Sequence, residues 1–215
     1  MGAGFVLLMV FIGLLLVSAV AALIAAIITA IVSDKERRTR KVLLALAAPF
    51  VFFVTLFFTG LFGLIIVSER TGTDIGIGDT WYLSLDDNHK LVMIDGTASG
   101  YLESEKNRNI DVVEIQQTGN KVYGRTENGH YFMLDLAAQQ LNEYALEKDF
   151  FEKGKLGNND VRLEPVADFY TRRKSERAWI WPVVAQITAL IISILTVFVF
   201  CRSILYGITL RPKKN

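Results

Sequence analysis

The chain alternates between long apolar stretches and one stretch of mixed polar and apolar residues. Asp, Glu, Lys and Arg are absent from Met1 to Ser33, from Val42 to Ser68 and from Ala178 to Cys201, which are gaps of 33, 27 and 24 residues. About 20 apolar residues span the hydrocarbon core of a bilayer, and soluble helices rarely avoid charge for so long because their outer face meets water. The pattern predicts three transmembrane helices, at 4–32, 42–67 and 178–200.

The stretch between the second and third apolar runs has the periodicity of β-structure. Short runs rich in β-formers flank the sequence DDNH at 86–89, and Asn128-Gly129 between two such runs suits a tight hairpin turn. These signals predict a small antiparallel sheet of five or six strands with one helix on it. The predicted fold is therefore a membrane protein with a transmembrane hairpin (1–68), a β-rich α+β extramembrane domain (69–177), and a third transmembrane helix with a basic tail (178–215).

Residues 136–153 allow two interpretations. The sequence LAAQQLNEYALEKDFFEK contains good helix formers throughout, and Gly154 would stop a long helix. Alternatively, LAAQQ is a turn, LNEYA is a strand, and only EKDFFEKG is a helix. The sequence leaves both open.

Two basic stretches, SDKERRTRK at 33–41 and TRRKSER at 171–177, would lie on opposite sides of a membrane that is crossed three times. Nine basic residues flank the spans on the side of the 33–41 loop and the C-terminal tail, against five on the domain side. Short loops dominate orientation, whereas long domains translocate largely regardless of charge. We expect the N-terminus and the 69–177 domain outside, and the loop and the C-terminus in the cytoplasm, in the inner membrane if the cell is bacterial. The determinants are Lys35, Arg37, Arg38, Arg40 and Lys41.

TRRKSER then needs a separate explanation. It is either a basic collar beside the phosphates of the lipid bilayer, or a dock for an anionic lipid or an acidic partner.

The apolar spans contain no ionisable side chain. Proton relays, voltage sensors and charged-substrate pathways normally need one, which argues against a transporter or pump that works alone. Small residues recur at helical spacing and would let another backbone approach closely, within the chain, in a homo-oligomer or in a membrane complex. These candidate helix-packing residues, together with the most polar group of the spans, are Ser18, Ala22, Ala26, Ala30, Thr55, Thr59, Gly63, Gln186 and Ser193.

The 69–177 domain is acidic, with 14 basic and 20 acidic side chains, and its net charge is −9 without residues 172–177. An acidic surface steers cationic partners and repels nucleic acid, so we expect a protein partner and no nucleic acid. The competing interpretation is ordinary solubility charge. The candidate partner-binding residues combine carboxylates with expected turns and one aromatic side chain: Asp86, Asp87, Tyr101, Glu103 and Glu105.

Catalytic signatures are weak. His89 and His130 have no Cys or His at metal-ligand spacing, and GTASG at 96–100 lacks the G-x-S-x-G pattern of a nucleophile elbow. Cys201 is the only cysteine, which excludes an intramolecular disulfide. We expect no enzyme activity, no metal and no cofactor.

Two function classes follow. The first is a non-catalytic membrane protein that presents an acidic extracytoplasmic β domain to a protein partner, as an immunity or inhibitor protein, a sensor or an assembly factor. The alternative is an accessory subunit of a channel or transporter complex, whose helices carry the main interaction.

Overall fold

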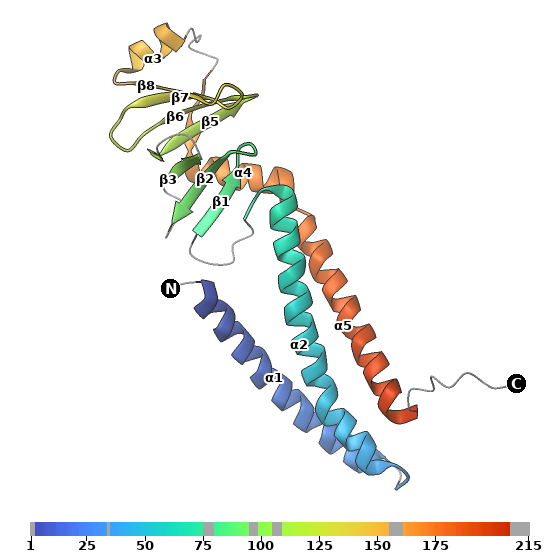
Figure 1. The fold of residues 1–215 in the computed structure, drawn as a ribbon. Helices are drawn as coiled ribbons and strands as arrows, with labels where there is room; N and C mark the ends of the chain where they lie inside the picture. The colour runs from blue at the N-terminus through green and yellow to red at the C-terminus, as the bar shows by residue number, and fades with distance from the viewer. Residues whose placement is uncertain are drawn as a thin grey trace, which may run out of the picture. The chain divides into compact units, whose positions relative to one another are not determined.

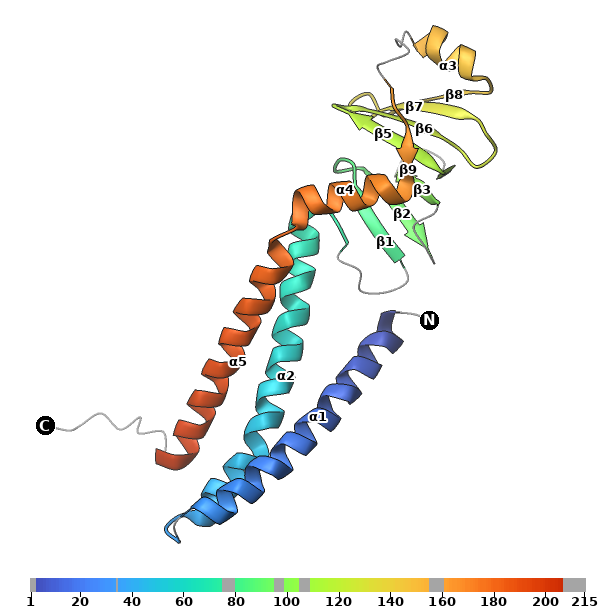
Figure 2. The ribbon, with the colours of Figure 1, turned by 180° about the vertical axis from the view of Figure 1, so that it is seen from behind.

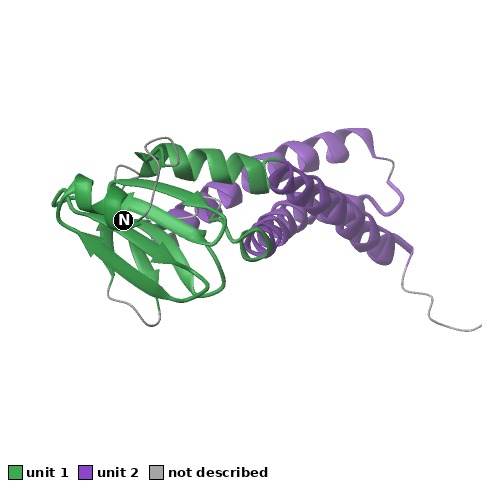
Figure 3. Ribbon diagram, turned by 90° about the horizontal axis from the view of Figure 1, so that it is seen from above, with its two compact units in different colours: residues 1–3, 68–179 green, residues 4–67, 180–215 purple. Residues whose placement is uncertain are grey.

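The computed structural model describes residues 3–33, 35–74, 80–94, 99–104, 109–154 and 161–206. The chain forms two compact units (Figure 3). The β unit comprises residues 1–3 and 68–179, and the helical unit comprises residues 4–67 and 180–215.

Three long apolar helices account for the helical unit, and α2 ends inside the β unit. They are α1 (Ala3–Val32), α2 (Arg38–Thr71) and α5 (Trp181–Tyr206). Each is long and apolar enough to cross a membrane, as the charge-free gaps predict. The second helix is longer than the apolar run because it continues through Glu69 and Arg70. The third begins at Trp181 because the residues before it belong to a separate helix, α4 (Val166–Ala178).

The β unit contains two antiparallel sheets, and both lie between the second and third long helices in the chain (Figures 1 and 2). One sheet has the order β1-β2-β3-β4 and the other β8-β7-β6-β5-β9. The strands are β1 (Thr80–Ser84), β2 (His89–Ile94), β3 (Gly100–Ser104), β4 (Ile110–Val112), β5 (Glu114–Thr118), β6 (Lys121–Arg125), β7 (Tyr131–Asp135), β8 (Gln140–Tyr144) and β9 (Glu164–Pro165).

The single sheet of five or six strands predicted from the sequence is therefore wrong. Ile110 and Val112 are buried in the first sheet, but the next buried residue of the same run is Ile115. The alternation shifts by one residue at Val113, and strands that pass from one sheet to another do so at such bends. Residues 110–118 thus supply one strand to each sheet, β4 to the first and β5 to the second, which a simple period of two does not reveal.

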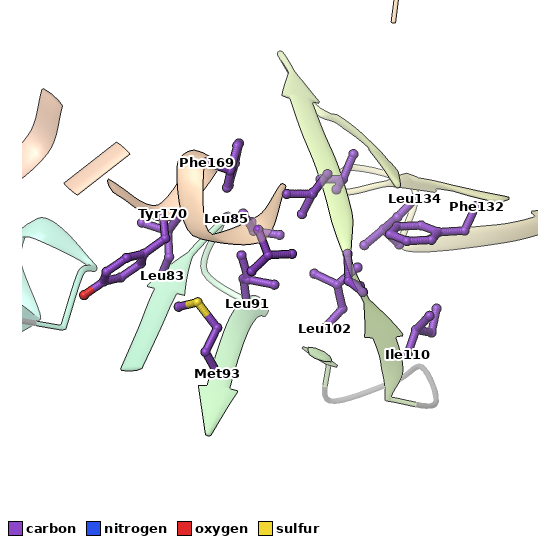
Figure 4. Close-up of a cluster of buried hydrophobic side chains, with 14 of the residues drawn as sticks. Leu83, Leu85, Leu91, Met93, Leu102, Ile110, Phe132, Leu134, Phe169 and Tyr170 are labelled. Carbon is purple, nitrogen blue, oxygen red and sulfur yellow. The ribbon is translucent and has the colours of Figure 1, made fainter. Parts of the chain in front are cut away.

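One hydrophobic core joins both sheets to α4 (Figure 4). Leu83 and Leu91 reach it from the first sheet and Phe132 from the second, and all three are fully buried. Val166, Phe169 and Tyr170 place the apolar face of α4 on the same core, at the i, i+3, i+4 spacing of one helix face. Full burial of such a side chain contributes about 1.5–3 kcal/mol. The predicted single helix on the sheet is corrected to two, α4 and α3 (Glu147–Gly154).

Residues 136–153 adopt the turn, strand and short helix of the second interpretation. Gln139 has φ 54° in the turn before β8, and Asp135 Oδ1 accepts the backbone N–H of Ala138 at 3.0 Å. Phe150 of α3 is fully buried, and its ring lies 5.3 Å from that of Tyr131. A continuous helix would lose the β7–β8 ladder and this aromatic contact. Gly129 has φ 81°, as the Asn-Gly hairpin requires.

The contact between β6 and β7 at Gly124 gives a stability prediction. A Cβ on Gly124 would lie 2.4 Å from Phe132 Cζ and 2.8 Å from the carbonyl oxygen of Glu114. Gly124→Ala should therefore destabilise the β unit by about 1–3 kcal/mol, the usual cost of overpacking. Thermal unfolding of the full chain in mild detergent, followed by β-sheet circular dichroism, measures the effect. Lys121→Ala, exposed on the same strand, is the control, and equal melting temperatures would contradict the contact.

Candidate functional site

The turn between β1 and β2 is built around Asp86. Its Oδ1 accepts the backbone N–H groups of Asn88 at 2.9 Å and His89 at 2.7 Å, which is an Asx turn. The same oxygen lies 2.9 Å from Nδ1 of the fully buried His89 ring. The carboxylate of Asp86 is therefore occupied within the turn, and Asp87 and Asn88 are the residues that the turn presents.

A cleft of about 240 Å³ lies beside this turn. Its lining residues come from the turn, β2 and β3: Asp87, Asn88, Lys90, Glu103 and Ser104. Lys90 and Glu103 are partners in the β2–β3 ladder, and the Lys90 ammonium lies 5.6 Å from the centre of the Tyr82 ring, within cation–π range. The cleft thus offers two carboxylates, one ammonium held toward an aromatic face, one amide and one hydroxyl.

Asp87 and Glu103, two of the five candidate partner-binding residues, meet in this cleft. Tyr101 is half-buried on β3, two residues before Glu103, and so points to the same face of the strand. Asp86 is turned toward His89. Glu105 lies outside the described residues.

Sequence reasoning missed Asn88, Lys90 and Ser104 as cleft residues. The strand pairing that aligns Lys90 with Glu103 brings them together, and no local pattern fixes that register. The charged Lys90 directly before the apolar residues 91–94 was the one available signal in the sequence. Among the described residues, no three His, Cys, Asp or Glu side chains are grouped as a metal site would need.

The basic stretch 171–177 forms the second half of α4, and its cations contact groups of the β unit itself. Arg172 pairs with Glu164 and Glu176, and the hydrogen bond to Glu164 raises the pKa of Arg172. Arg173 lies 3.6 Å from the carboxylate of Glu176, and Lys174 lies 5.4 Å from the Tyr170 ring centre.

Arg177 completes the set by donating to the carbonyl oxygen of Ser84 at 2.7 Å. Burial lowers the pKa of Arg177, and the charge of Arg173 lowers it further. These contacts, all made with groups of the β unit, favour a structural role for the stretch.

Hydrogen bonds also join the beginning of the β unit to β1. Gly72 has φ 60°, and its carbonyl oxygen accepts the backbone N–H of Ser84 at 2.7 Å. The backbone N–H of Asp74 donates to the carbonyl oxygen of Tyr82 at 2.9 Å. Ser68 Oγ bonds the Tyr82 hydroxyl at 2.9 Å. Tyr170 of α4 donates to the carbonyl oxygen of Asp74 at 2.8 Å. We call these bonds, together with the Arg177–Ser84 bond, the terminal contact network.

The helix-packing candidates lie at different depths in the helical unit. Ser18, Ala22, Ala26 and Ser193 are buried, Ala30, Thr55, Thr59 and Gly63 are half-buried, and Gln186 is exposed. Ser193 Oγ donates to the Ala189 carbonyl oxygen of its own helix at 2.7 Å. The rings of Phe11 and Phe57 lie 5.1 Å apart, so Phe57 packs within the unit.

The expected orientation determinants surround the loop between α1 and α2. Lys35, Arg37, Arg38 and Arg40 are exposed, and Lys41 is half-buried. Arg38 bonds the carbonyl oxygen of Ala30, and Arg37 donates to that of Leu205 at 3.3 Å.

Comparison of the chain with models of known families, with curated proteins and with solved structures finds no match.

The buried position of Ala26 gives a prediction for the helical unit. Ala26→Leu places three more carbon atoms at a site that is 8% exposed, and overpacking of this kind costs about 1–3 kcal/mol. We expect a lower melting temperature of the helical signal in detergent. Val20→Phe adds comparable volume where the side chain is 59% exposed and should be neutral. Equal melting of both variants would remove the packing role of Ala26.

Tyr170 gives a pH prediction for the terminal contact network. Burial raises its pKa from 10.0 to about 12, and the charge of Asp74 adds to the rise. The neutral phenol therefore contributes stability that is complete below pH 10 and is lost as the pH rises toward 12. Tyr170→Phe should cost about 0.5–1.5 kcal/mol at pH 8, and its deficit should shrink above pH 10.

Melting temperatures of the wild type and Tyr170→Phe between pH 8 and about pH 11 measure this difference, in the range where the phenols titrate. Tyr206→Phe is the control, because Tyr206 is 74% exposed. A deficit that stays constant across the range would show that Tyr170 titrates as an ordinary tyrosine.

Proposed function

We propose that this chain is a non-catalytic integral membrane protein that presents the β unit to a protein partner outside the cytoplasm. The cleft beside the β1–β2 turn is the proposed contact, and it takes a cationic side chain of the partner. The carrying observation is that Asp87 and Glu103, which belong to two separate acidic segments, line one cleft. Solubility charge alone does not require such convergence.

The proposed location rests on the three membrane-length helices. Their exposed apolar side chains, such as Leu16, Ile31 and Phe62, suit the lipid bilayer and would be a large unpartnered apolar surface in water. We propose that the N-terminus and the β unit lie outside and that the 33–41 loop and the C-terminus lie in the cytoplasm. The short basic loop favours this orientation. The basic side chains at 172–177 make contacts within the β unit, so their charge has a structural explanation that does not require the cytoplasmic side.

The chemistry of the cleft favours a guanidinium or ammonium group. Carboxylates bind arginine with charge-assisted, often bidentate, hydrogen bonds, and Asn88 and Ser104 can donate or accept beside them. The ammonium of Lys90 would repel a second cationic group, so the cleft suits one charged side chain of the partner and not a polycation. The acidic surface of the domain would raise the association rate, and this effect weakens with salt.

Photo-crosslinking from the cleft tests the proposal in the full chain. Asn88 is replaced by benzoylphenylalanine, and adducts are collected from membranes of the native cell. We expect a discrete protein adduct whose yield falls at least fivefold in Asp87→Asn/Glu103→Gln. The matched control is Glu127→Gln/Glu143→Gln, which removes the same charge from exposed positions in the β6–β7 turn and in β8 and should leave the yield unchanged.

The salt dependence separates steering from simple contact. Adduct yield at short exposure should differ between the cleft variant and wild type at about 50 mM salt and should converge at about 300 mM, where the Debye length is shorter. The proposed cleft would be contradicted if wild type and Asp87→Asn/Glu103→Gln gave the same adduct yield at every salt concentration. It would also be contradicted if no adduct formed. Partner association that persists without the β unit would instead favour the accessory-subunit function.

A further inference from the structure

The imidazole of His89 is a fully buried polar group at the end of the turn that borders the cleft. Its Nδ1 lies 2.9 Å from Oδ1 and 3.1 Å from Oδ2 of Asp86. Burying a polar group costs free energy unless a hydrogen bond compensates it, and an apolar side chain would fill a core position without that cost. Packing alone therefore does not account for a histidine at this position.

The contact with Asp86 assigns the proton of the ring. An ionised carboxylate only accepts hydrogen bonds, and a neutral imidazole has one N–H donor and one acceptor nitrogen. Nδ1 of His89 lies beside both carboxylate oxygens and must therefore be the donor. Nε2 is buried and has no hydrogen-bond partner within the described part of the chain, so a proton there would be a buried donor without an acceptor. The geometry selects the Nδ1–H tautomer.

This N–H group connects the core to the residues that the turn presents. The enclosed ring fixes the Asp86 carboxylate, and Oδ1 of that carboxylate accepts the backbone N–H groups of Asn88 at 2.9 Å and of His89 at 2.7 Å. Asp87 lies between two residues that are held in this way. Ser104, the cross-strand partner of His89, lines the cleft together with Asp87 and Asn88.

We propose that His89 is a positioning residue of the cleft. Its Nδ1–H group holds the Asp86 carboxylate, which in turn fixes the backbone that presents Asp87 and Asn88. This inference rests on the proposed function, because it takes the cleft as the contact of the partner. It predicts that the donor at Nδ1, and not the volume of the ring, determines partner binding.

Two substitutions separate the hydrogen bond from the packing. His89→Asn places an amide N–H near the position of Nδ1 but leaves part of the space of the ring empty, whereas His89→Leu keeps an apolar side chain and has no donor. With the crosslinker at position 88, the adduct yield should stay within about twofold of wild type in His89→Asn and should fall roughly fivefold or more in His89→Leu. His89→Asn should nevertheless have the lower melting temperature, because it leaves a cavity. A role in packing alone predicts that the adduct yield follows the melting temperature.

Hydrogen exchange of the full chain in detergent micelles tests the same step without the partner. The N–H of Asn88 should exchange about tenfold faster in His89→Leu than in wild type, since its acceptor is no longer held. The N–H of Gly129, which donates to the carbonyl oxygen of Thr126 at 2.9 Å in another turn, is the control and should not change.

Asp86→Ala removes the acceptor instead of the donor, at a side chain that is 27% exposed, and should therefore retain the fold. It should reproduce the effect of His89→Leu on the adduct yield. The double variant should lose no more than either single variant, because the two residues act through one hydrogen bond.

Long-range ¹H–¹⁵N NMR at about pH 8, where an ordinary imidazole is neutral, identifies the tautomer. The proton should be on Nδ1 of His89, and His130→Gln assigns the signals because the chain has two histidines.

The outcomes distinguish this inference from the proposed function. A ring proton on Nε2, or equal exchange of the Asn88 N–H in wild type, His89→Leu and Asp86→Ala, would overturn the positioning role and leave the proposed function standing. Adduct yields that follow the melting temperatures of the variants would also overturn it. If wild type forms no adduct while the exchange and NMR results are as expected, only the proposed function is contradicted.

Discussion

The hydrogen bonds of the terminal contact network fix both chain ends of the β unit to the same strand. Residues 72–74 bond along the outer edge of β1, while Tyr170 and Arg177 of α4 bond to Asp74 and Ser84. The edge of β1 is thereby covered, which removes a site for unwanted strand pairing. The turn that presents Asp87 begins directly after Ser84, so the same bonds support the base of the proposed partner cleft.

The membrane-length helices could be predicted from the sequence because the requirement for such a helix concerns only consecutive residues. A segment that meets hydrocarbon must exclude charge over about 20 residues, and three gaps in the charge pattern meet that condition. The hairpin turn at Asn128-Gly129 is local for the same reason, since it depends on Gly129 adopting a positive φ. Helix α4 was not predicted, because its cations suggested a membrane collar and its apolar face has a partner only once both sheets exist.

The change of sheet at Val113 and the composition of the cleft depend on contacts distant in sequence. Ile110 and Ile115 belong to different sheets although only four residues lie between them, and only pairing with β3 and β6 distinguishes the two. Asp86 and Asp87 are neighbours of identical chemistry, yet one is bonded to the buried His89 and the other lines the cleft. The sequence indicated an acidic turn here, but the turn geometry assigns the two carboxylates different roles.

The side of the membrane on which the β unit lies is the central claim, because an extracytoplasmic partner can reach the cleft only from outside. Cys201 is the only cysteine, so Cys201→Ser gives a background for single thiols introduced by Asn128→Cys in the β unit or Thr39→Cys in the first turn of α2. Both positions are exposed. A membrane-impermeant maleimide applied to intact cells, or to spheroplasts of a bacterium, should label the thiol at 128 at once and the thiol at 39 only after permeabilisation. The reverse pattern would place the β unit in the cytoplasm and contradict the proposed function.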